Sequence, residues 1–263
     1  MKIKNLKILL VDDEPEFLEI SLNFLKKANE NLEIETTSSV KDALEYLQNK
    51  SFDVIVSDYQ MYGLNGLDFL EKLRENGNTT PLIIFTGKGR EEIAIRALNS
   101  GADFYLQKSS DPYVFTELNH FIITSSEKNL INKRYIELLE KYKLVMTNLT
   151  EGVALEDQNG KFIYANQKML DLFEYSEEEL YGKHWKFLVP PEEFEKVLAE
   201  SKKRPEGFES SYELVALKKS GEKFKILIKG TPIFSKNEKK FTGTLVVFTD
   251  ITYIRELESK IIF

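Results

Sequence analysis

Short apolar runs and longer amphipathic segments alternate five times in the first 125 residues of this chain. The runs have the length of strands and read KILLV (7–11), IETT (34–37), FDVIVS (52–57), PLIIFT (81–86) and DFYLQ (103–107). Segments with apolar residues at helical spacing follow them, at 16–28, 40–49, 67–76, 91–101 and 113–124. Because parallel strands need a crossover connection, usually a helix, this alternation predicts a doubly wound α/β fold with a five-stranded parallel sheet.

The pattern changes after residue 150. EGVALED (151–157) and KFIYAN (161–166) flank the turn QNG, a strong signal for an antiparallel hairpin. Short helical segments and three longer strand-like runs follow, at 166–174, 177–181, 191–203, 208–219, 222–233 and 241–251. This half therefore predicts an α+β domain with a five-stranded antiparallel sheet. The expected division is a first domain at 1–125, a helical connector at 126–149, a second domain at 150–252 and an exit helix at 253–263.

Apolar residues in the connector repeat at the spacing of a coiled coil. They lie alternately 4 and 3 positions apart and form what we call the heptad seam: Ile131, Tyr135, Leu138, Tyr142, Val145 and Leu149. No glycine or proline interrupts 113–149, so the last helix of the first domain can continue through this segment. Two interpretations fit the spacing, a homodimer joined along the seam and a single amphipathic helix packed on its own second domain.

Composition narrows the classes of function. The formal net charge of −7 disfavours nonspecific binding to nucleic acids or anionic membranes, which rely on basic surfaces. The sequence has no run of 18 apolar residues, and acids interrupt its apolar N-terminal segment, so we expect a cytoplasmic protein without a membrane span or signal peptide. The absence of cysteine excludes disulfides, thiolate metal sites and cysteine nucleophiles. Only His120 and His184 offer imidazoles, too few for a histidine-rich metal site.

Polar side chains end four of the five predicted parallel strands. Asp12 and Asp13 follow the first strand, Asp58 follows the third, Thr86 ends the fourth and Lys108 follows the fifth. Each residue alone also fits an ordinary role, such as a helix cap or a solvated lysine. The carboxyl ends of parallel strands share one edge of a sheet, however, so all five residues are expected to meet there.

Three carboxylates at one edge suggest a specific chemistry. They repel one another unless a cation lies among them, and ligands that are all oxygen favour Mg²⁺. A carboxylate beside such an ion can accept a phosphoryl group. Lys108 would then offset charge on the transferred group, and Thr86 could donate a hydrogen bond to it.

Residues 5 to about 124 resemble the receiver domain of two-component response regulators. The matching segments are ILLVDDEPEFL, FDVIVSDYQMYGLNGLDFL, PLIIFTGKGREE and GADFYLQKSSDP. The resemblance implies that Asp58 is the phosphoacceptor and that a partner histidine kinase is its phosphodonor. It also implies Mg²⁺ ligands from Asp13, Asp58 and the Gln60 carbonyl, with Asp12 acting mainly through a water on the metal.

The same resemblance implies a switch pair and a partner for the phosphate. Thr86 would move toward the phosphoryl group while Tyr105 turns inward, and Lys108 would pair with the phosphate. The family usually has proline directly after this lysine, whereas this chain has Ser109. A cis peptide bond before serine costs about 2.5–4 kcal/mol, so the departure concerns the geometry of the loop rather than the chemistry. FTGKGRE (85–91) lacks the spacing of a phosphate-binding P-loop and is interpreted as the mobile loop after the fourth strand.

Residues 142 to about 252 resemble a PAS sensor domain, a five-stranded antiparallel sheet with short helices that form one wall of a cavity. The matching segments are LTEGVALEDQNGKFIYANQKMLDLFEYSEEELYGKHW, KKSGEKFKILI and VVFTDIT. Within the first of these, SEEE (176–179) predicts a capping box between Ser176 and Glu179.

The residues of this chain limit which ligands such a cavity could bind. The cysteinyl-flavin form of the fold needs a cysteine, and the haem form resembling this chain uses a histidine on the long helix. That helix is here PPEEFEKVLAESKK (190–203), which has no histidine, and His184 before it is interpreted as a helix-start or surface residue. Seven aromatic residues are expected to fill a core rather than line a pocket: Phe162, Tyr164, Phe173, Trp185, Phe187, Phe208 and Phe248. We favour a PAS module that is empty or binds a small ligand, with a noncovalent flavin or an organic acid as alternatives.

The favoured hypothesis is a phosphorelay protein without turnover catalysis, in which Asp58 is phosphorylated and the connector relays the change to the PAS domain. Two alternatives are a PAS module driven by its own ligand, whose receiver mainly docks a partner, and the N-terminal part of a longer hybrid sensor kinase. A Mg²⁺-dependent phosphatase would want a D-x-D motif after the first strand, which this chain lacks. No kinase domain or DNA-binding segment is recognised, and His120 is interpreted as a packing or surface residue.

Overall fold

A computed structural model describes residues 5–87 and 91–261 of the chain. The chain divides into two compact units, Met1–Glu137 and Leu138–Phe263. Residues 88–90 of the predicted mobile loop lie outside the described residues. None of the described helices combines the length and the apolar character that crossing a membrane requires.

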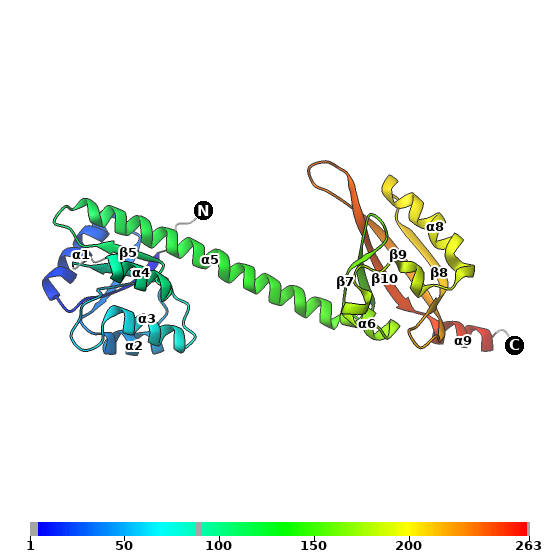
Figure 1. The fold of residues 1–263 in the computed structure, drawn as a ribbon, viewed down its shortest axis with the longest axis horizontal. Coiled ribbons are helices and arrows are strands. Elements are labelled where there is room, and N and C mark those ends of the chain that lie inside the picture. The colour runs from blue at the N-terminus through cyan, green and yellow to red at the C-terminus, as the bar shows by residue number, and fades with distance from the viewer. Residues whose placement is uncertain (1–4, 88–90, 262–263) are drawn as a thin grey trace. The chain divides into compact units, whose positions relative to one another are not determined.

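The first unit is a parallel sheet covered by helices on both faces (Figure 1). Its strand order is β2-β1-β3-β4-β5, with bounds β1 Leu6–Val11, β2 Leu32–Thr37, β3 Val54–Ser57, β4 Leu82–Thr86 and β5 Phe104–Gln107. The helices are α1 Pro15–Ala28, α2 Val40–Asn49, α3 Gly66–Glu75, α4 Glu91–Asn99 and α5 Tyr113–Asn148. This confirms the predicted doubly wound fold.

Alternation along each strand explains the two hydrophobic cores. In β1, Ile8 and Leu10 pack with α1 and α5, whereas Leu9 and Val11 pack with α2, α3 and α4. Since successive side chains of a strand point to opposite faces, a strand that is apolar at every position must be covered on both. The helices therefore hold the sheet in place and leave only its edges and the ends of its strands free for function.

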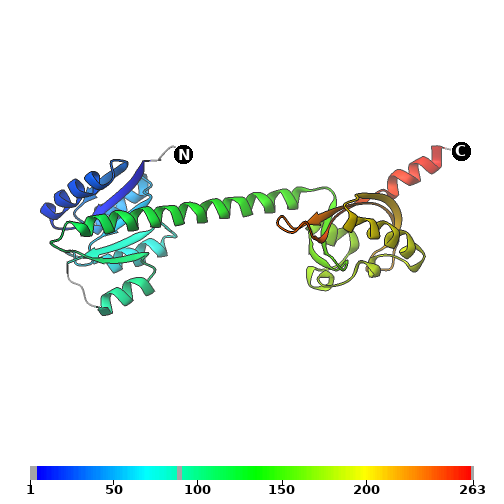
Figure 2. The same ribbon diagram turned by 90° about the horizontal axis from the view of Figure 1, so that it is seen from above.

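The second unit is built on an antiparallel sheet with the order β7-β6-β10-β9-β8 (Figures 1 and 2). The strands are β6 Gly152–Asp157, β7 Phe162–Ala165, β8 Ser210–Leu217, β9 Lys223–Phe234 and β10 Phe241–Asp250. The α-helices are α6 Gln167–Phe173, α7 Glu177–Leu180, α8 Phe194–Lys203 and α9 Thr252–Ile261. Short 3₁₀ turns occupy Trp185–Leu188, Pro191–Glu193 and Arg204–Glu206, so the segment predicted as one helix from 191 starts as a 3₁₀ turn.

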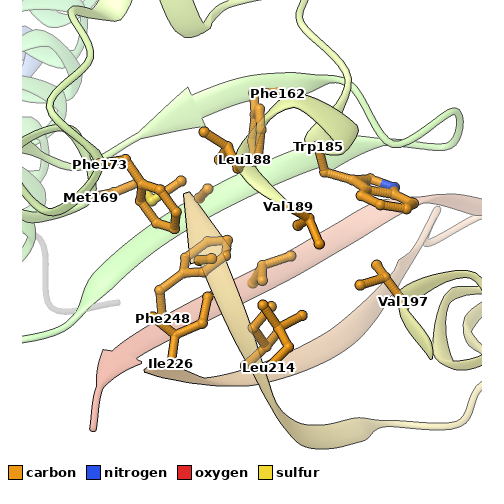
Figure 3. Packing of buried hydrophobic residues seen from close by; sticks show 14 of the residues in the cluster. Phe162, Met169, Phe173, Trp185, Leu188, Val189, Val197, Leu214, Ile226 and Phe248 are labelled. Atoms are coloured by element: carbon orange, nitrogen blue, oxygen red, sulfur yellow. The ribbon is translucent and has the colours of Figure 1, made fainter. Parts of the chain in front are cut away.

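One core cluster fills the concave side of this sheet (Figure 3). Phe162, Phe173, Trp185 and Phe248 are buried in it, as the sequence predicts. The prediction for Phe208 is wrong, because its side chain is 59% exposed. Phe208 precedes the first residue of β8 and is therefore not held against the inner face of the sheet.

Two local predictions in this unit are confirmed. Ser176 and Glu179 form the capping box at the start of α7, with the Ser176 hydroxyl accepting from Glu179 N and the Glu179 carboxylate accepting from Ser176 N. His184 caps the next 3₁₀ turn, where its Nδ1 accepts from Lys186 N at 3.3 Å. In the first unit, His120 is exposed on α5, as expected for a surface residue.

Helix α5 continues past the first unit and contains most of the heptad seam. Of the seam residues, Ile131, Tyr135 and Leu138 have exposed fractions of 62–65%, and the Tyr142 ring lies 6.2 Å from the ring of Tyr164. Leu149 lies one residue beyond the end of the helix. The seam is thus an exposed apolar stripe for most of its length.

Candidate functional site

The structure brings together the three carboxylates that the sequence places at strand ends. Oxygen atoms of Asp12, Asp13 and Asp58 lie within 4.8 Å of one another. Asp12 and Asp58 are buried and Asp13 is half-buried. Strands β1 and β3 are direct neighbours, with Val11 paired to Ser57, and this pairing sets their following aspartates side by side.

Backbone N–H groups orient each carboxylate. Tyr59 N donates to Asp58 Oδ1 at 2.7 Å, Glu14 N donates to Asp12 Oδ1 at 3.1 Å, and Tyr62 N donates to Asp13 Oδ2 at 2.8 Å. Hydrogen bonds of this kind favour the charged form of a carboxylate. They also fix which oxygen atoms face the shared space.

Lys108 lies between two of the aspartates. Its Nζ is 2.6 Å from Asp12 Oδ2 and 3.5 Å from Asp58 Oδ2, and it sits 4.0 Å from the centre of the Phe17 ring. Its backbone N donates to Thr86 O at 2.8 Å, which ties the ends of β4 and β5 together. The ammonium is thus held by two opposite charges and by the face of an aromatic ring.

Burial raises the pKa of the Asp12 carboxyl, and the nearby charge of Asp58 raises it further. The hydrogen bond and charge of Lys108 act in the opposite direction but do not cancel the effect. A cation among the carboxylates would favour their charged forms. The donor set is all oxygen, which fits a hard ion such as Mg²⁺.

A pocket of about 640 Å³ opens over these residues. Its walls include Asp13, Asp58, Gln60, Thr86 and Lys108. Thr86 is 1% exposed and Gln60 is exposed. The fifth predicted strand also delivers Tyr105, a half-buried residue that packs against the core beneath α2, α3 and α4. Every residue predicted for this site therefore lies in or beside one pocket, apart from Tyr105, which lies in the adjoining core.

Two neighbours of the site escaped the sequence analysis. A Cβ at Gly66 would lie 2.3 Å from the Asp58 carbonyl oxygen, so only glycine allows α3 to start this close to the end of β3. Phe17 supplies the ring beneath Lys108. The sequence does show that a glycine follows the Asn65 cap of α3 and that an aromatic residue lies in the first turn of α1. Neither feature reveals which contact the residue makes.

The loop after β5 departs from the family pattern in sequence. All peptide bonds of the described residues are trans, including the one between Lys108 and Ser109. Lys108 nevertheless reaches both Asp12 and Asp58.

Family models match both halves of the chain. Residues 8–118 match the response regulator receiver domain, and residues 150–253 match the PAS domain. The response regulator SaeR of Staphylococcus epidermidis is 30% identical over 151 residues, which cover 57% of this chain and 64% of that protein. The chain thus spans less than two thirds of the length of that relative.

Solved structures of single domains resemble each half. The receiver domain of the Francisella response regulator 1452 is 31% identical, with 48% of this chain and 99% of that chain covered and a TM-score of 0.42. The PAS domain of a Colwellia psychrerythraea protein is 24% identical, with 44% and 98% covered and a TM-score of 0.41. The family matches and the two observed sheets show that the chain contains a response regulator receiver domain followed by a PAS domain, an architecture that supports a role in two-component signal transduction.

Proposed function

We propose that Asp58 accepts a phosphoryl group from a partner histidine kinase in a Mg²⁺-dependent reaction. The observation that carries this proposal is the cluster of Asp12, Asp13 and Asp58 with Lys108 at the floor of an open pocket. The pocket has a volume of about 640 Å³, which is room enough for a side chain of a partner. The receiver then acts as the acceptor and not as an enzyme that turns over a substrate of its own.

Each residue of the site has a distinct role in the phosphoryl transfer. A lone pair of Asp58 Oδ2 attacks phosphorus, the bond from phosphorus to the kinase imidazole nitrogen breaks, and the electron pair stays on that nitrogen. The hydrogen bond from Tyr59 N to Asp58 Oδ1 holds the carboxylate in place, while Asp58 Oδ2 faces Lys108. Lys108 can then follow the transferred phosphoryl oxygens and offset their charge.

Asp13, Asp58 and the Gln60 carbonyl would hold Mg²⁺, with Asp12 contributing through water. The ion, when bound, offsets negative charge on the phosphoryl oxygens. The backbone N–H groups of Glu14 and Tyr62 hold the Asp12 and Asp13 carboxylates in place for that role.

The relay proceeds from Thr86 to the output. Thr86, at the end of β4, approaches the phosphoryl group, and Tyr105 on the neighbouring strand moves further into the core. The resulting conformational change at β4 and β5 is transmitted through α5 to the PAS domain. A homodimer formed along the heptad seam is the assembly that we propose for this relay.

Phosphorylation with acetyl phosphate and Mg²⁺ tests the proposal. Wild type should gain one phosphoryl group, measured by intact mass or a phosphate-affinity gel, and Asp58→Asn should gain none. Asp53→Asn is the matched control, because Asp53 lies outside the site just before β3, and it should be phosphorylated like wild type. Absence of modification in wild type, or equal modification of Asp58→Asn, would contradict the assignment.

A further inference from the structure

Arg204 and Glu156 form a buried pair of opposite charges in the PAS domain, and the proposed function uses neither. Arg204 comes from the 3₁₀ turn after α8 and is 4% exposed, whereas Glu156 comes from β6 and is 5% exposed. Charges taken out of water need good hydrogen bonds to repay the lost hydration. If the role of the pair is only structural, its two side chains should therefore be joined by short hydrogen bonds.

The Arg204 guanidinium is loosely held. Its Nη1 lies 3.6 Å from Glu156 Oε2, which is beyond hydrogen-bonding distance. Nε and Nη2 donate to the Ser210 hydroxyl at 3.4 Å, and Nη2 donates to the Tyr212 hydroxyl at 3.4 Å. These contacts are all longer than the roughly 3.2 Å of ordinary N–H···O bonds. A planar fork that can bind a carboxylate through two parallel hydrogen bonds is thus buried with weak partners.

Gly230 shows that the sheet makes room for this guanidinium. A Cβ at this position of β9 would lie 2.7 Å from Nη2 and 2.8 Å from Cζ of Arg204. The φ angle of Gly230 lies outside the left-handed region, so its backbone conformation does not require glycine. The requirement comes from the arginine, which lies directly against the strand.

A pocket of about 190 Å³ opens onto the charged pair. Glu156 and Arg204 line it together with Trp185, Leu198 and Thr244. Sites for drug-sized ligands start at roughly 300 Å³, so this pocket fits a smaller molecule. Its walls combine two cations, Arg204 and the exposed Lys202, with the carboxyl groups of Glu156 and Asp157 and an apolar side.

We propose that this pocket binds a small organic monocarboxylate, whose carboxylate displaces Glu156 from the Arg204 guanidinium. A monocarboxylate matches the charge of the group that it replaces. A phosphate dianion would bring two negative charges to Arg204, beside the carboxyl groups of Glu156 and Asp157, and Lys202, the other cation of the lining, is exposed to solvent. The indole of Trp185 and the side chain of Leu198 provide an apolar wall for the rest of the ligand. This site is separate from phosphoryl transfer at Asp58.

Glu156 can be displaced because it can become neutral. Burial raises the pKa of its carboxyl to about 7, the charge of Asp157 acts in the same direction, and Arg204 lowers it. When a ligand takes over Arg204, Glu156 loses its opposite charge and takes up a proton. The other titratable groups around the pair and the pocket are Asp157, His184, Lys202 and Tyr212.

The fluorescence of Trp185, the single tryptophan of the chain, reports occupancy of the pocket. The full chain is titrated with butyrate and benzoate, and with butyramide and benzamide as uncharged controls of similar shape. We expect a saturable change with at least one carboxylate and none with its amide. Because binding requires neutral Glu156, the Kd should rise about tenfold for each pH unit above 7.

Variants decide between a ligand site and a structural ion pair. Glu156→Gln removes the internal competitor, so it should bind carboxylates about tenfold more tightly than wild type at pH 8 and lose the pH dependence. Gly230→Ala displaces the guanidinium and should abolish binding, whereas Lys50→Met, at an exposed position of the receiver, should leave the Kd unchanged. Equal responses to carboxylates and amides, weaker binding by Glu156→Gln, or no response in either wild type or Glu156→Gln would overturn the proposal.

Discussion

Lys108 is the cation that the receiver site provides for its buried carboxylates. Asp12 and Lys108 are 2% and 11% exposed at their side chains, and their charged atoms are 2.6 Å apart. Removing one partner of a buried ion pair costs about 3–5 kcal/mol, because the other charge is left unpaired. We expect Lys108→Met to lower the free energy of unfolding by about 3 kcal/mol in Mg²⁺-free buffer, measured by urea titration.

Lys50 offers a matched control for that substitution. It pairs with Glu35 at the same distance of 2.6 Å, but both side chains are 41–51% exposed. Exposed pairs contribute about 0–1 kcal/mol, so Lys50→Met should have little effect. If both variants lost the same stability, burial would not explain the importance of Lys108.

Gly66 permits close approach of α3 to Asp58. The Cβ of Gly66→Ala would overlap the Asp58 carbonyl oxygen at 2.3 Å and approach Ile84 Cδ1 at 3.1 Å. We expect this variant to lose about 1–3 kcal/mol of stability, since the backbone must move, and to accept phosphate more slowly. Both effects are measurable by urea titration and by the rate of phosphorylation with acetyl phosphate.

Gly87 serves as the comparison for Gly66. Among the described residues, a Cβ there would meet only Lys108 Cδ, at 3.8 Å, which is an ordinary contact. Gly87→Ala should therefore change the free energy of unfolding by less than about 0.5 kcal/mol. A loss as large as that of Gly66→Ala would show that the local space around Asp58 does not set the effect.

At the scale of elements, α5 carries an exposed apolar stripe with the period of a coiled coil. Leu138 lies at the middle of the heptad seam and is 65% exposed. A charge at a core position of a coiled coil opposes association. We expect Leu138→Glu to lower the mass measured by light scattering from dimer to monomer.

Lys133→Glu introduces the same side chain on the exposed surface of α5, away from the seam. It should leave the mass at that of the dimer. A wild-type mass equal to one chain, 30.5 kDa, would reject the proposed dimer. An unchanged dimer mass for Leu138→Glu would place the interface elsewhere.

For the molecule as a whole, the relay hypothesis predicts that a phosphoryl group at Asp58 changes the conformation of the second unit. Beryllium fluoride with Mg²⁺ imitates a phosphoryl group. Hydrogen exchange of amides in residues 138–149 and in β6 should then change together with exchange in the receiver. Asp58→Asn should show neither change, and a response confined to the receiver in wild type would favour a receiver that only docks a partner.

Much of the molecule follows from patterns that are local in the sequence. The apolar runs and amphipathic segments predict all ten strands of the described residues, with ends that differ by a few residues, as for β2, which begins at Leu32 rather than at residue 34. Asp12, Asp58 and Lys108 could be assigned to one site because each directly follows a strand, and a parallel sheet sends these ends to one edge. Phe208 was misplaced because aromatic character alone does not say which side of a strand boundary a residue occupies.

The order of elements, the two sheet types and the acidic edge follow from the amino-acid sequence, because periodicity and strand ends are properties of neighbouring residues. Three contacts became known only from the folded chain: Phe17 lies beneath Lys108, Gly66 borders Asp58, and Arg204 meets Glu156. Glu156 lies in a strand and Arg204 in a turn 48 positions later, so their meeting depends on strand register and on the path of α8. The physical reason is that contacts distant in the chain are set by how whole elements pack, and no short window of sequence contains that information.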